Sequence, residues 1–514
     1  MSHSRAGARQ WFGLVLLALP ALVIAMDFTA LHLAVPALSA DLQPSSAQLL
    51  WIVDIYGFMI AGLLIAMGTL GDRIGRRRLL LIGGGAFALA SLVAAFSTSA
   101  PMLIGARALL GITGATLLPS TLSLISNIFT HPGQRRFAIA IWSTAFMLGS
   151  AIGPLAGGVL LQWFWWGSVF LPAVPVMVAL VVLGPRLLPE FRSESAGRTD
   201  PLSVALAFTS ILPGVYGIKE IATSGLSPGP VLGLLAAAGF GWLFIHRQRH
   251  LTNPLLDLGL FADRRFSASL GTQAISLFTL AAVQFFLMQY LQLVLGLSPL
   301  HAGLLTVPGF VLGIAGNLVI PWLARVIRPS ILIATALALC VVALVIIAGA
   351  GTDGLPAVIT GFCLLNFALN PAMVVTYDLI ITSAPPARAG TAAGTAETGN
   401  ELGIAMGVAI AGSIGSAVYR QMVTPQTLPD GLPSGAAEAA RDTLAGALAA
   451  AEDLPGPLAD DVVALASSAF TDGMQVTALL LAGLLTAVAI TVAVLLRRVP
   501  VGGQPASVHE DLNH

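Results

Sequence analysis

Residues 68–78 read GTLGDRIGRRR and separate two apolar runs, near 49–70 and 79–97, that are each long enough to cross a bilayer as a helix. The glycines permit a tight turn between the two runs. An acid beside several arginines can form a charge cluster in one conformation and lose it in another, whereas the simpler interpretation is an ordinary basic loop. We favour a conformational latch, made of Gly68, Gly71, Asp72, Arg73, Gly75 and Arg76.

The rest of the chain is equally apolar. Of its 514 residues, 56% are hydrophobic and 9% are charged, whereas a soluble domain carries about 25% charged residues. The runs near 201–222 and 230–246 are the weakest, and their loss as a pair would leave twelve spans. The pattern predicts an all-α polytopic membrane protein with fourteen transmembrane helices, near 11–36, 49–70, 79–97, 102–125, 137–160, 165–188, 201–222, 230–246, 267–295, 301–323, 329–350, 356–381, 390–418 and 473–496.

Basic side chains are distributed unevenly between the predicted loops. With the N-terminus inside, 20 of the 24 basic residues fall in cytoplasmic segments. Lys219, Arg420 and Arg441 fall outside, and Arg107 falls within a span. The excess of basic residues in cytoplasmic loops therefore predicts a multi-pass protein of the cytoplasmic (inner) membrane with both termini in the cytoplasm.

The chain divides into two six-helix halves. Residues 1–200 are expected to form the N-terminal bundle, 201–250 two additional helices, and 251–498 the C-terminal bundle with an outside loop at 419–472. Residues 499–514 are expected to be a disordered cytoplasmic tail. The first apolar run could be a signal peptide, but it continues to Pro36, so we interpret it as an uncleaved span.

Four acidic residues lie inside predicted spans: Asp27, Asp54, Glu397 and Glu401. A carboxylate there costs a few kcal/mol even on lenient insertion scales, and such residues usually bind cations or carry protons. Glu397 and Glu401 are four residues apart and share a helix face. Asp27 and Asp54 could share the outer half of one cavity. Arg107 needs a carboxylate or a wet cavity, unless it reaches the membrane interface instead.

Small residues recur in the fifth span. Glycines four apart line one helix face and allow close helix contact, and a proline bends the helix. The alternative is ordinary packing of small residues, which is common in membrane helices. The residues concerned are Gly149, Gly153, Pro154, Gly157 and Gly158.

The segment 68–78 resembles the loop motif of the major facilitator superfamily between spans two and three. The segments MDFT at 26–29 and WIVDIY at 51–56 resemble the first- and second-span signatures of its fourteen-span drug:proton antiporters, the QacA- and SmvA-like multidrug efflux pumps. The resemblance covers nearly the whole chain. It implies a major facilitator fold, an antiporter motif at Gly149–Gly158, a coupling role for Arg107, and function for the acidic residues at 397 and 401.

The predicted tenth span departs from this pattern. QacA-like pumps can carry an acidic residue there, but residues 301–323 contain neither Asp nor Glu. Any handling of divalent cations is therefore in doubt. Aromatic side chains could line the path of a lipophilic cation through cation–π contacts, although packing against helices is as good an explanation. The candidate lining residues are Tyr56, Phe285, Phe286, Tyr290 and Asn317.

These features predict a transporter rather than an enzyme. We expect a proton-coupled antiporter that exports lipophilic, mainly cationic drugs and biocides such as quaternary ammonium compounds and dyes; the alternative is an exporter dedicated to one endogenous metabolite or lipid. No nucleotide-binding Gly-x-x-x-x-Gly-Lys motif occurs, so the proton gradient replaces a cofactor. Without a Cys/His cluster we expect no metal site. The expected partners are small cationic substrates, protons and lipids, with no nucleic acid, and the expected state is a monomer.

Overall fold

The computed structural model describes residues 7–192, 200–251, 254–324, 326–384, 389–497 and 499. Within these ranges it contains helices and no strand, and fourteen of the helices are long and apolar enough to cross a membrane. The prediction of an all-α protein with fourteen spans is therefore confirmed. The expected tail at 499–514 lies outside the described residues, apart from Val499.

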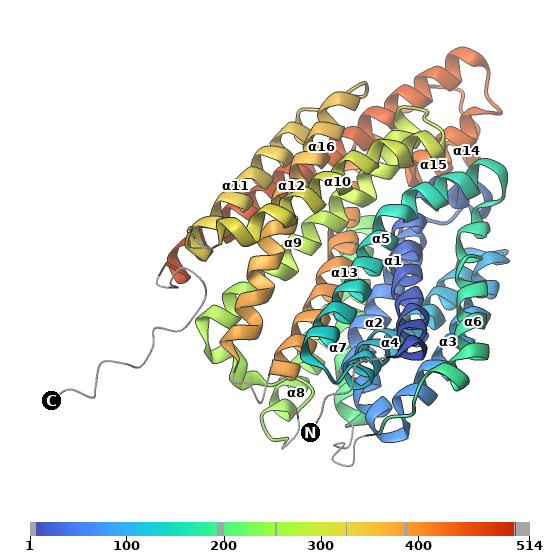
Figure 1. The fold of residues 1–514 in the computed structure, drawn as a ribbon. Coiled ribbons are helices and arrows are strands. Elements are labelled where there is room, and N and C mark those ends of the chain that lie inside the picture. Colours follow the sequence, from blue (N-terminus) through green and yellow to red (C-terminus); the bar gives the residue numbers. More distant parts are fainter. Residues whose placement is uncertain are drawn as a thin grey trace.

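The helices form two packed groups (Figure 1). The first contains α1 (Ala8–Leu42), α2 (Ser46–Ile74), α3 (Arg76–Ala95), α4 (Ala100–Ile128), α5 (Pro132–Trp163) and α6 (Ala173–Leu187). The second contains α9 (Arg264–Gln289), α10 (Pro299–Leu323), α11 (Pro329–Ala348), α12 (Leu355–Ser383), α13 (Ala389–Met422) and α16 (Gly456–Leu495). We call these the N-terminal and the C-terminal group.

The two remaining long helices, α7 (Pro201–Ser224) and α8 (Pro228–Gln248), pack on each other as a hairpin. At its open end Asp200 accepts two hydrogen bonds from Arg247, at 2.5 and 3.0 Å. These bonds lower the pKa of Asp200 to about 2. Helix α7 also contacts both α2 and α13. The hairpin therefore touches both groups through α7.

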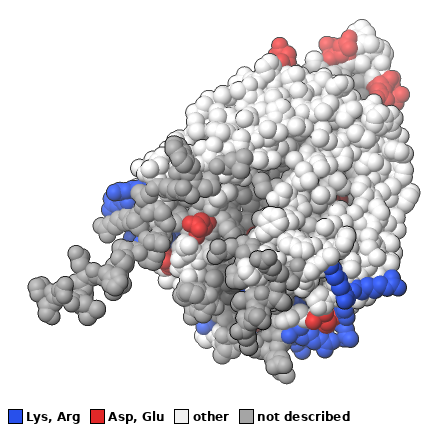
Figure 2. Space-filling model, in the orientation of Figure 1, with Lys and Arg blue, Asp and Glu red and all other residues white. Residues whose placement is uncertain are grey.

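The short helices α14 (Ser434–Asp442) and α15 (Leu444–Ala451) lie at one end of the molecule (Figure 1). Acidic side chains are visible at this end, whereas Lys and Arg gather toward the opposite end (Figure 2). We call the two ends the α14/α15 end and the arginine-rich end. Helix α16 begins at Gly456, so the span expected near 473–496 starts earlier, and the loop expected at 419–472 shortens to the segment between Met422 and Gly456.

Local sequence signals explain several helix boundaries. Ser45 caps α2 by accepting from the backbone N–H of Gln48, whose side chain accepts in return from the backbone N–H of Ser45. Gly75 joins α2 to α3 with φ +113°, a left-handed conformation that favours glycine. The motif at 68–78 therefore ends one span and begins the next.

Candidate functional site

Asp27 and Arg107 form a buried ion pair between α1 and α4. Oδ2 of Asp27 lies 2.8 Å from Nη1 of Arg107, and the two side chains are 4% and 0% exposed. The guanidinium also donates to the carbonyl oxygens of Ile52, at 3.2 Å, and Val53, at 3.5 Å. Its central carbon lies 4.4 Å from the centre of the Tyr56 ring. Arg107 is therefore fully enclosed by protein, and its contacts tie α1, α2 and α4 together.

A second buried pair joins α2 to α7. Oδ2 of Asp54 lies 2.8 Å from Nζ of Lys219, with side-chain exposures of 0% and 1%. The ammonium also lies 4.3 Å from the centre of the Trp51 ring. Asp54 and Asp27 thus sit in separate ion pairs rather than in one shared cavity, which corrects the expectation from the sequence.

Lys219 is the functional candidate that sequence reasoning missed. The distribution of basic residues predicts that it lies outside, yet it is buried within α7, inside a candidate span. A signal was available, because this single lysine of the chain falls within the predicted span at 201–222, and a basic residue at such a place requires a carboxylate or water.

The two acids of α13 have different surroundings. Glu397 is exposed and lines a cavity of about 450 Å³, within the range of roughly 300–1,000 Å³ typical of small-molecule sites. Glu401, one turn further along, is half-buried, and its backbone carbonyl faces Gly57 of α2. Among the described side chains, no Lys or Arg forms an ion pair with either glutamate.

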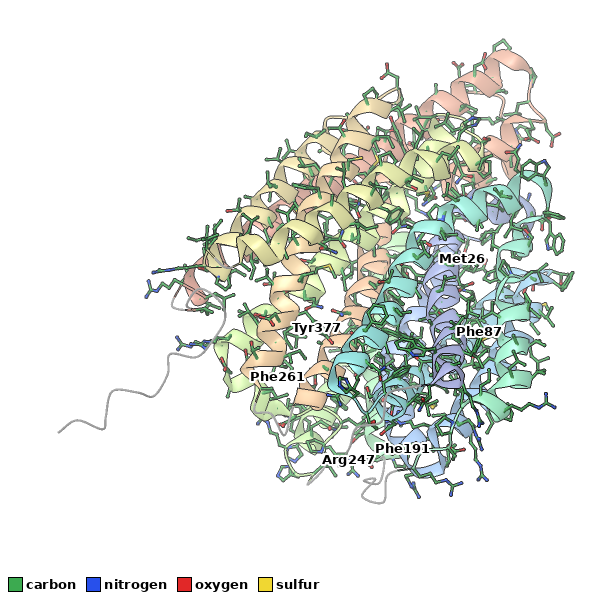
Figure 3. The ribbon with its side chains drawn as sticks, viewed as in Figure 1. Met26, Phe87, Phe191, Arg247, Phe261 and Tyr377 are labelled. Carbon is green, nitrogen blue, oxygen red and sulfur yellow. The ribbon has the colours of Figure 1, made fainter. Side chains whose placement is uncertain are left out.

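The cavity lies between the N-terminal and C-terminal groups. Its walls come from α5, α9, α10, α12 and α13, and combine apolar side chains with amides. Tyr377, one of the lining residues, lies nearer the arginine-rich end than Met26, the neighbour of Asp27 (Figure 3). The lining residues are Phe146, Ser150, Ala151, Gln273, Leu277, Leu280, Phe310, Gly313, Ile314, Asn317, Asn366, Asn370, Met373, Val374, Tyr377, Glu397 and Asn400.

Of the five side chains expected to line a substrate path, only Asn317 lines this cavity. Tyr56 instead covers Arg107. Tyr290 is fully buried, where its hydroxyl donates to the carbonyl of Gly351 and accepts from the N–H of Gly354. These two aromatic residues have structural partners, so packing explains them.

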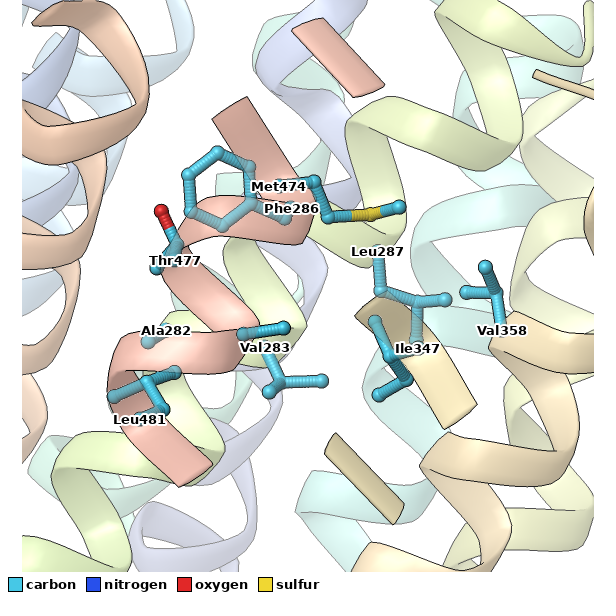
Figure 4. A pocket seen from close by; sticks show the side chains of 10 residues that line it. Ala282, Val283, Phe286, Leu287, Ile347, Val358, Met474, Thr477 and Leu481 are labelled. Atoms are coloured by element: carbon cyan, nitrogen blue, oxygen red, sulfur yellow. The ribbon is translucent and has the colours of Figure 1, made fainter. Parts of the chain in front are cut away.

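Phe285 and Phe286 are also packing residues. Phe285 contacts the ring of His32, with centroids 6.5 Å apart. Phe286 packs against Phe470 with the two rings tilted by 57°, and it lines a separate apolar cavity of only about 10 Å³ inside the C-terminal group (Figure 4). A space of that size holds no more than one water molecule. Neither phenylalanine lines the large cavity.

The glycines of α5 serve two contacts. A methyl group added at Gly149 or Gly153 would collide with Leu22 or Thr29 of α1, and one at Gly157 would come 3.2 Å from the Cβ of Ala30. At Gly158 it would instead lie 2.8 Å from the Cα of Leu300 on α10. The motif therefore packs α5 against α1 and, through its last glycine, against the other group.

Besides the packing of α2 on α13, a further set of contacts between the two groups lies toward the α14/α15 end. Besides Gly158 and Leu300, the carbonyl oxygen of Pro154 touches Gly303. The side chain of Gln292, which follows α9, donates to the carbonyl of Leu33 at 2.9 Å. The large cavity lies on the arginine-rich side of these contacts, since Glu397 is only eight residues from the start of α13.

The loop at 68–78 meets an acid that the sequence did not single out. Glu190, which follows α6, accepts from the backbone N–H of Arg77 at 3.1 Å and lies 3.6 and 3.9 Å from the guanidinium groups of Arg77 and Arg78. The backbone N–H of Arg76 donates to the carbonyl of Phe191. The side chain of Asp72 lies outside the described part of the structure, so its predicted pairing does too.

Comparison with known proteins decides the family. Residues 17–408 match the model of the Major Facilitator Superfamily. The chain belongs to the major facilitator superfamily. It is a membrane transporter, as predicted, and not an enzyme. Its fold resembles a bacterial homologue of the lysosomal transporter Spinster in an inward-facing, unoccupied conformation, with 17% identity, a TM-score of 0.67, and 96% of this chain and 98% of the other covered.

Relatives of this superfamily member include named drug pumps. It is 45% identical over 498 residues to the multidrug efflux pump LfrA of Mycolicibacterium smegmatis, covering 97% of this chain and 98% of the relative. It is 37% identical to the methyl viologen resistance protein SmvA of Salmonella typhimurium (75% and 78% covered). It is 33% identical to the tetracenomycin C resistance and export protein of Streptomyces glaucescens (75% and 72% covered). The resemblance to multidrug efflux pumps is therefore confirmed.

Proposed function

We propose that the protein exports lipophilic, mainly cationic drugs and biocides, including quaternary ammonium compounds and dyes, in exchange for protons. The observation that carries this proposal is Glu397, a carboxylate without a described ion-pair partner in the wall of a large, mostly apolar cavity. An apolar wall accommodates the frame of a lipophilic cation, and the carboxylate balances its charge. The relatives named as multidrug efflux pumps support the direction of transport.

Exchange of a drug for a proton follows because the proton and the cationic drug compete for the single negative charge of a glutamate. A carboxylate that has taken up a proton no longer attracts a cation, and a bound cation opposes protonation of the same group. Glu397 and Glu401 lie one turn apart on α13, so the charge state of one acts on the other. Uptake of a proton from outside would displace the drug, and release of that proton inside would restore the site.

The buried pairs of the N-terminal group have a different part in this proposal. Arg107 stays charged at any physiological pH, and Asp27 is the carboxyl group that lies 2.8 Å from it. We propose that a proton reaches Asp27 when this pair opens. We propose that Asp27 and Arg107 respond to the state of the cavity through α2, whose backbone Arg107 binds and whose Gly57 faces Glu401.

The charge distribution supports an orientation. Described arginines of the arginine-rich end include Arg77, Arg186 and Arg247, and such residues accumulate on the cytoplasmic side of membrane proteins. We propose a protein of the cytoplasmic membrane with both termini inside and the cavity facing the cytoplasm. The proton gradient drives it without a nucleotide or metal, and the membrane potential supplies about 2.3 kcal/mol per charge per 100 mV. We propose that it acts as a monomer.

The test is ethidium efflux from proteoliposomes with an imposed pH gradient. We expect efflux that stops when the gradient is collapsed and that is lost in the Glu397→Gln variant. Efflux that continues without a proton gradient, or at the wild-type rate in Glu397→Gln and Glu401→Gln, would show that these acids do not couple the two flows.

A second candidate is export of one endogenous product. The relative named for tetracenomycin C resistance and export supports it. Resistance of a pump-deficient host to a panel of unrelated dyes and biocides separates the two, since a dedicated exporter would protect against none or one of them.

A further inference from the structure

His32 lies on α1 where this helix meets the C-terminal group near the α14/α15 end. The next residue, Leu33, accepts the hydrogen bond of Gln292 through its carbonyl oxygen, at 2.9 Å. The centre of the imidazole ring lies 6.5 Å from that of the Phe285 ring on α9 and 5.4 Å from that of the Phe28 ring on α1, and both pairs meet edge to face. The ring of His32 is therefore part of the contact between the two groups at this end.

This imidazole ring is enclosed without a hydrogen-bond partner. His32 is 1% exposed, and neither its Nδ1 nor its Nε2 has a partner within hydrogen-bond distance. Buried polar atoms are nearly always hydrogen-bonded, so the closed arrangement leaves the single N–H of a neutral ring unmatched. A protonated ring would bring a charge and a second donor into the same place, next to two phenylalanine rings that offer no oxygen or nitrogen. The closed arrangement is therefore unfavourable for imidazolium.

The nearest charges of the N-terminal group do not compensate a positive charge on His32. Asp27, on the same helix, is engaged by Arg107 of α4, whose own positive charge opposes a second one on the ring. Helix α2 brings Asp54, but this carboxylate is paired with Lys219. Both acids of this region are thus already matched by a cation.

Among the described side chains, no further acid faces the ring from the helices packed on α1. Asp41, at the end of α1, is about two and a half turns away and accepts a hydrogen bond from Trp166 at 2.6 Å. Apart from Tyr56 and the residues just named, the titratable side chains described on α2, α4, α5, α6 and α9 are arginines in a first or last turn. Helix α10 carries His301 in its first turn, and α15 carries no titratable group. A charge on His32 is therefore stabilised only when water reaches the ring.

Opening of the α14/α15 end changes these surroundings. Separation of the two groups takes Phe285 away from the ring and lets in water, in which an imidazole binds a proton with a pKa of about 6.5. We propose, on the basis of the proposed orientation and proton-driven cycle, that His32 is a pH-sensing gate residue: it is neutral while this end is closed and is protonated from outside once the end opens. A ring nitrogen takes the proton of a hydronium ion and leaves water, and the proton must return to water before the end closes again.

The direction and size of the pH effect follow from this scheme. Only the open conformation binds the proton, so acid shifts the equilibrium toward opening and alkali shifts it toward closure. An imidazole in water is about 90% protonated at pH 5.5 and about 3% protonated at pH 8. Between these two pH values, the ratio of open to closed molecules should therefore rise about tenfold through His32 alone.

The distance between the two groups at this end tests the proposal. Spin labels are placed at positions 163 and 297 of the full chain, with Cys340 and Cys363 replaced, and the purified protein is studied in lipid nanodiscs at pH 8 and at pH 5.5. The populations of the short and the long distance give the ratio of closed to open molecules. Comparing each variant with itself at the two pH values cancels any constant effect of a substitution on this ratio.

Two variants remove the titration of His32 in different ways. His32→Gln keeps a polar side chain, and His32→Phe keeps a ring between Phe28 and Phe285. His301→Gln is the matched control, because the exposed ring of His301 lies at the start of α10 and has a hydrogen-bond partner, the Oγ of Ser298 at 2.7 Å. Thermal unfolding in detergent checks that each variant is folded.

We expect the pH response of wild type to be retained in His301→Gln and to be about tenfold smaller in both His32 variants. The carboxylates of α13 are present in every protein compared, so any response that they contribute is common to all. An equal response in wild type and in the folded His32 variants would overturn the proposal, and so would a loss of the response in His301→Gln alone.

Ethidium efflux under a pH gradient, measured with the same proteins, separates this inference from the proposed function. Proton-driven efflux together with an unchanged pH response in the His32 variants would overturn the role of His32 and leave the proposed function standing. A pH response that depends on His32, in a protein without proton-driven efflux, would support the gate and overturn the proposed function.

Discussion

The acidic residues within the spans have different surroundings in the two groups of helices. In the N-terminal group, Asp27 and Asp54 are buried, and each lies 2.8 Å from a basic side chain. In α13, Glu397 faces a cavity, and neither it nor Glu401 has a described ion-pair partner. The same residue type in the same apolar medium can thus serve as part of a fixed framework or as an exchangeable site, and its neighbours decide which.

The largest effect is expected at the unpaired acids. Glu397→Gln removes the charge with little change in shape and should lower proton-driven efflux by on the order of 100-fold, the lower end of what one positioned proton-transferring group contributes. Efflux of ethidium after a pH jump measures it, and thermal unfolding in detergent serves as the control for folding. Near wild-type efflux in both glutamine variants would remove the distinction between the two groups.

The paired acids should behave as pairs. Lys219→Met alone leaves Asp54 as a buried carboxylate without its cation, which costs about 3–5 kcal/mol of stability, whereas replacing both partners by neutral groups is often close to neutral. We therefore expect a marked fall of Tm in Lys219→Met and recovery in Asp54→Asn/Lys219→Met. A double variant as unstable as the single one would show that the ion pair is not the reason for burying Lys219.

Closure of the α14/α15 end should depend on the contact between Gly158 and Leu300. Gly158→Leu forces α5 away from Leu300, and overpacking of about 1–3 kcal/mol would shift the conformational equilibrium by roughly 5-fold to 160-fold toward opening of the α14/α15 end. Spin labels at positions 163 and 297, in a chain with Cys340 and Cys363 replaced, should then report a longer distance. Gly105→Leu is the matched control, because a Cβ there meets nothing within 4 Å. An unchanged distance in Gly158→Leu would contradict the assignment of this contact.

The smallest effect is expected for the exposed pairs. Arg77 and Arg78 are 28% and 65% exposed beside Glu190, and exposed pairs contribute about 0–1 kcal/mol. Glu190→Gln should therefore shift Tm by only a degree or two, and the shift should shrink in high salt. A loss as large as that of Lys219→Met would mean that burial does not set the strength of these pairs.

Sequence patterns predicted the spans and identified the acids, because an apolar run of sufficient length and a charge within it are visible along the chain. They did not reveal partners, since Asp27 and Arg107 are 80 residues apart and only the packing of α1 on α4 brings them together. The same limit explains why the residues that line the cavity were not predicted from the sequence. Tyr290 and Asn370 both lie in apolar helices, and which face meets the cavity depends on the neighbouring helices.

Proton release on drug binding tests the central distinction most directly. Purified protein in weakly buffered detergent solution is mixed with a cationic drug, and a pH indicator records the protons set free. We predict release in wild type and in Asp54→Asn/Lys219→Met, and none in Glu397→Gln/Glu401→Gln. Release that persists without the glutamates of α13, or that disappears with the Asp54–Lys219 pair, would contradict the account.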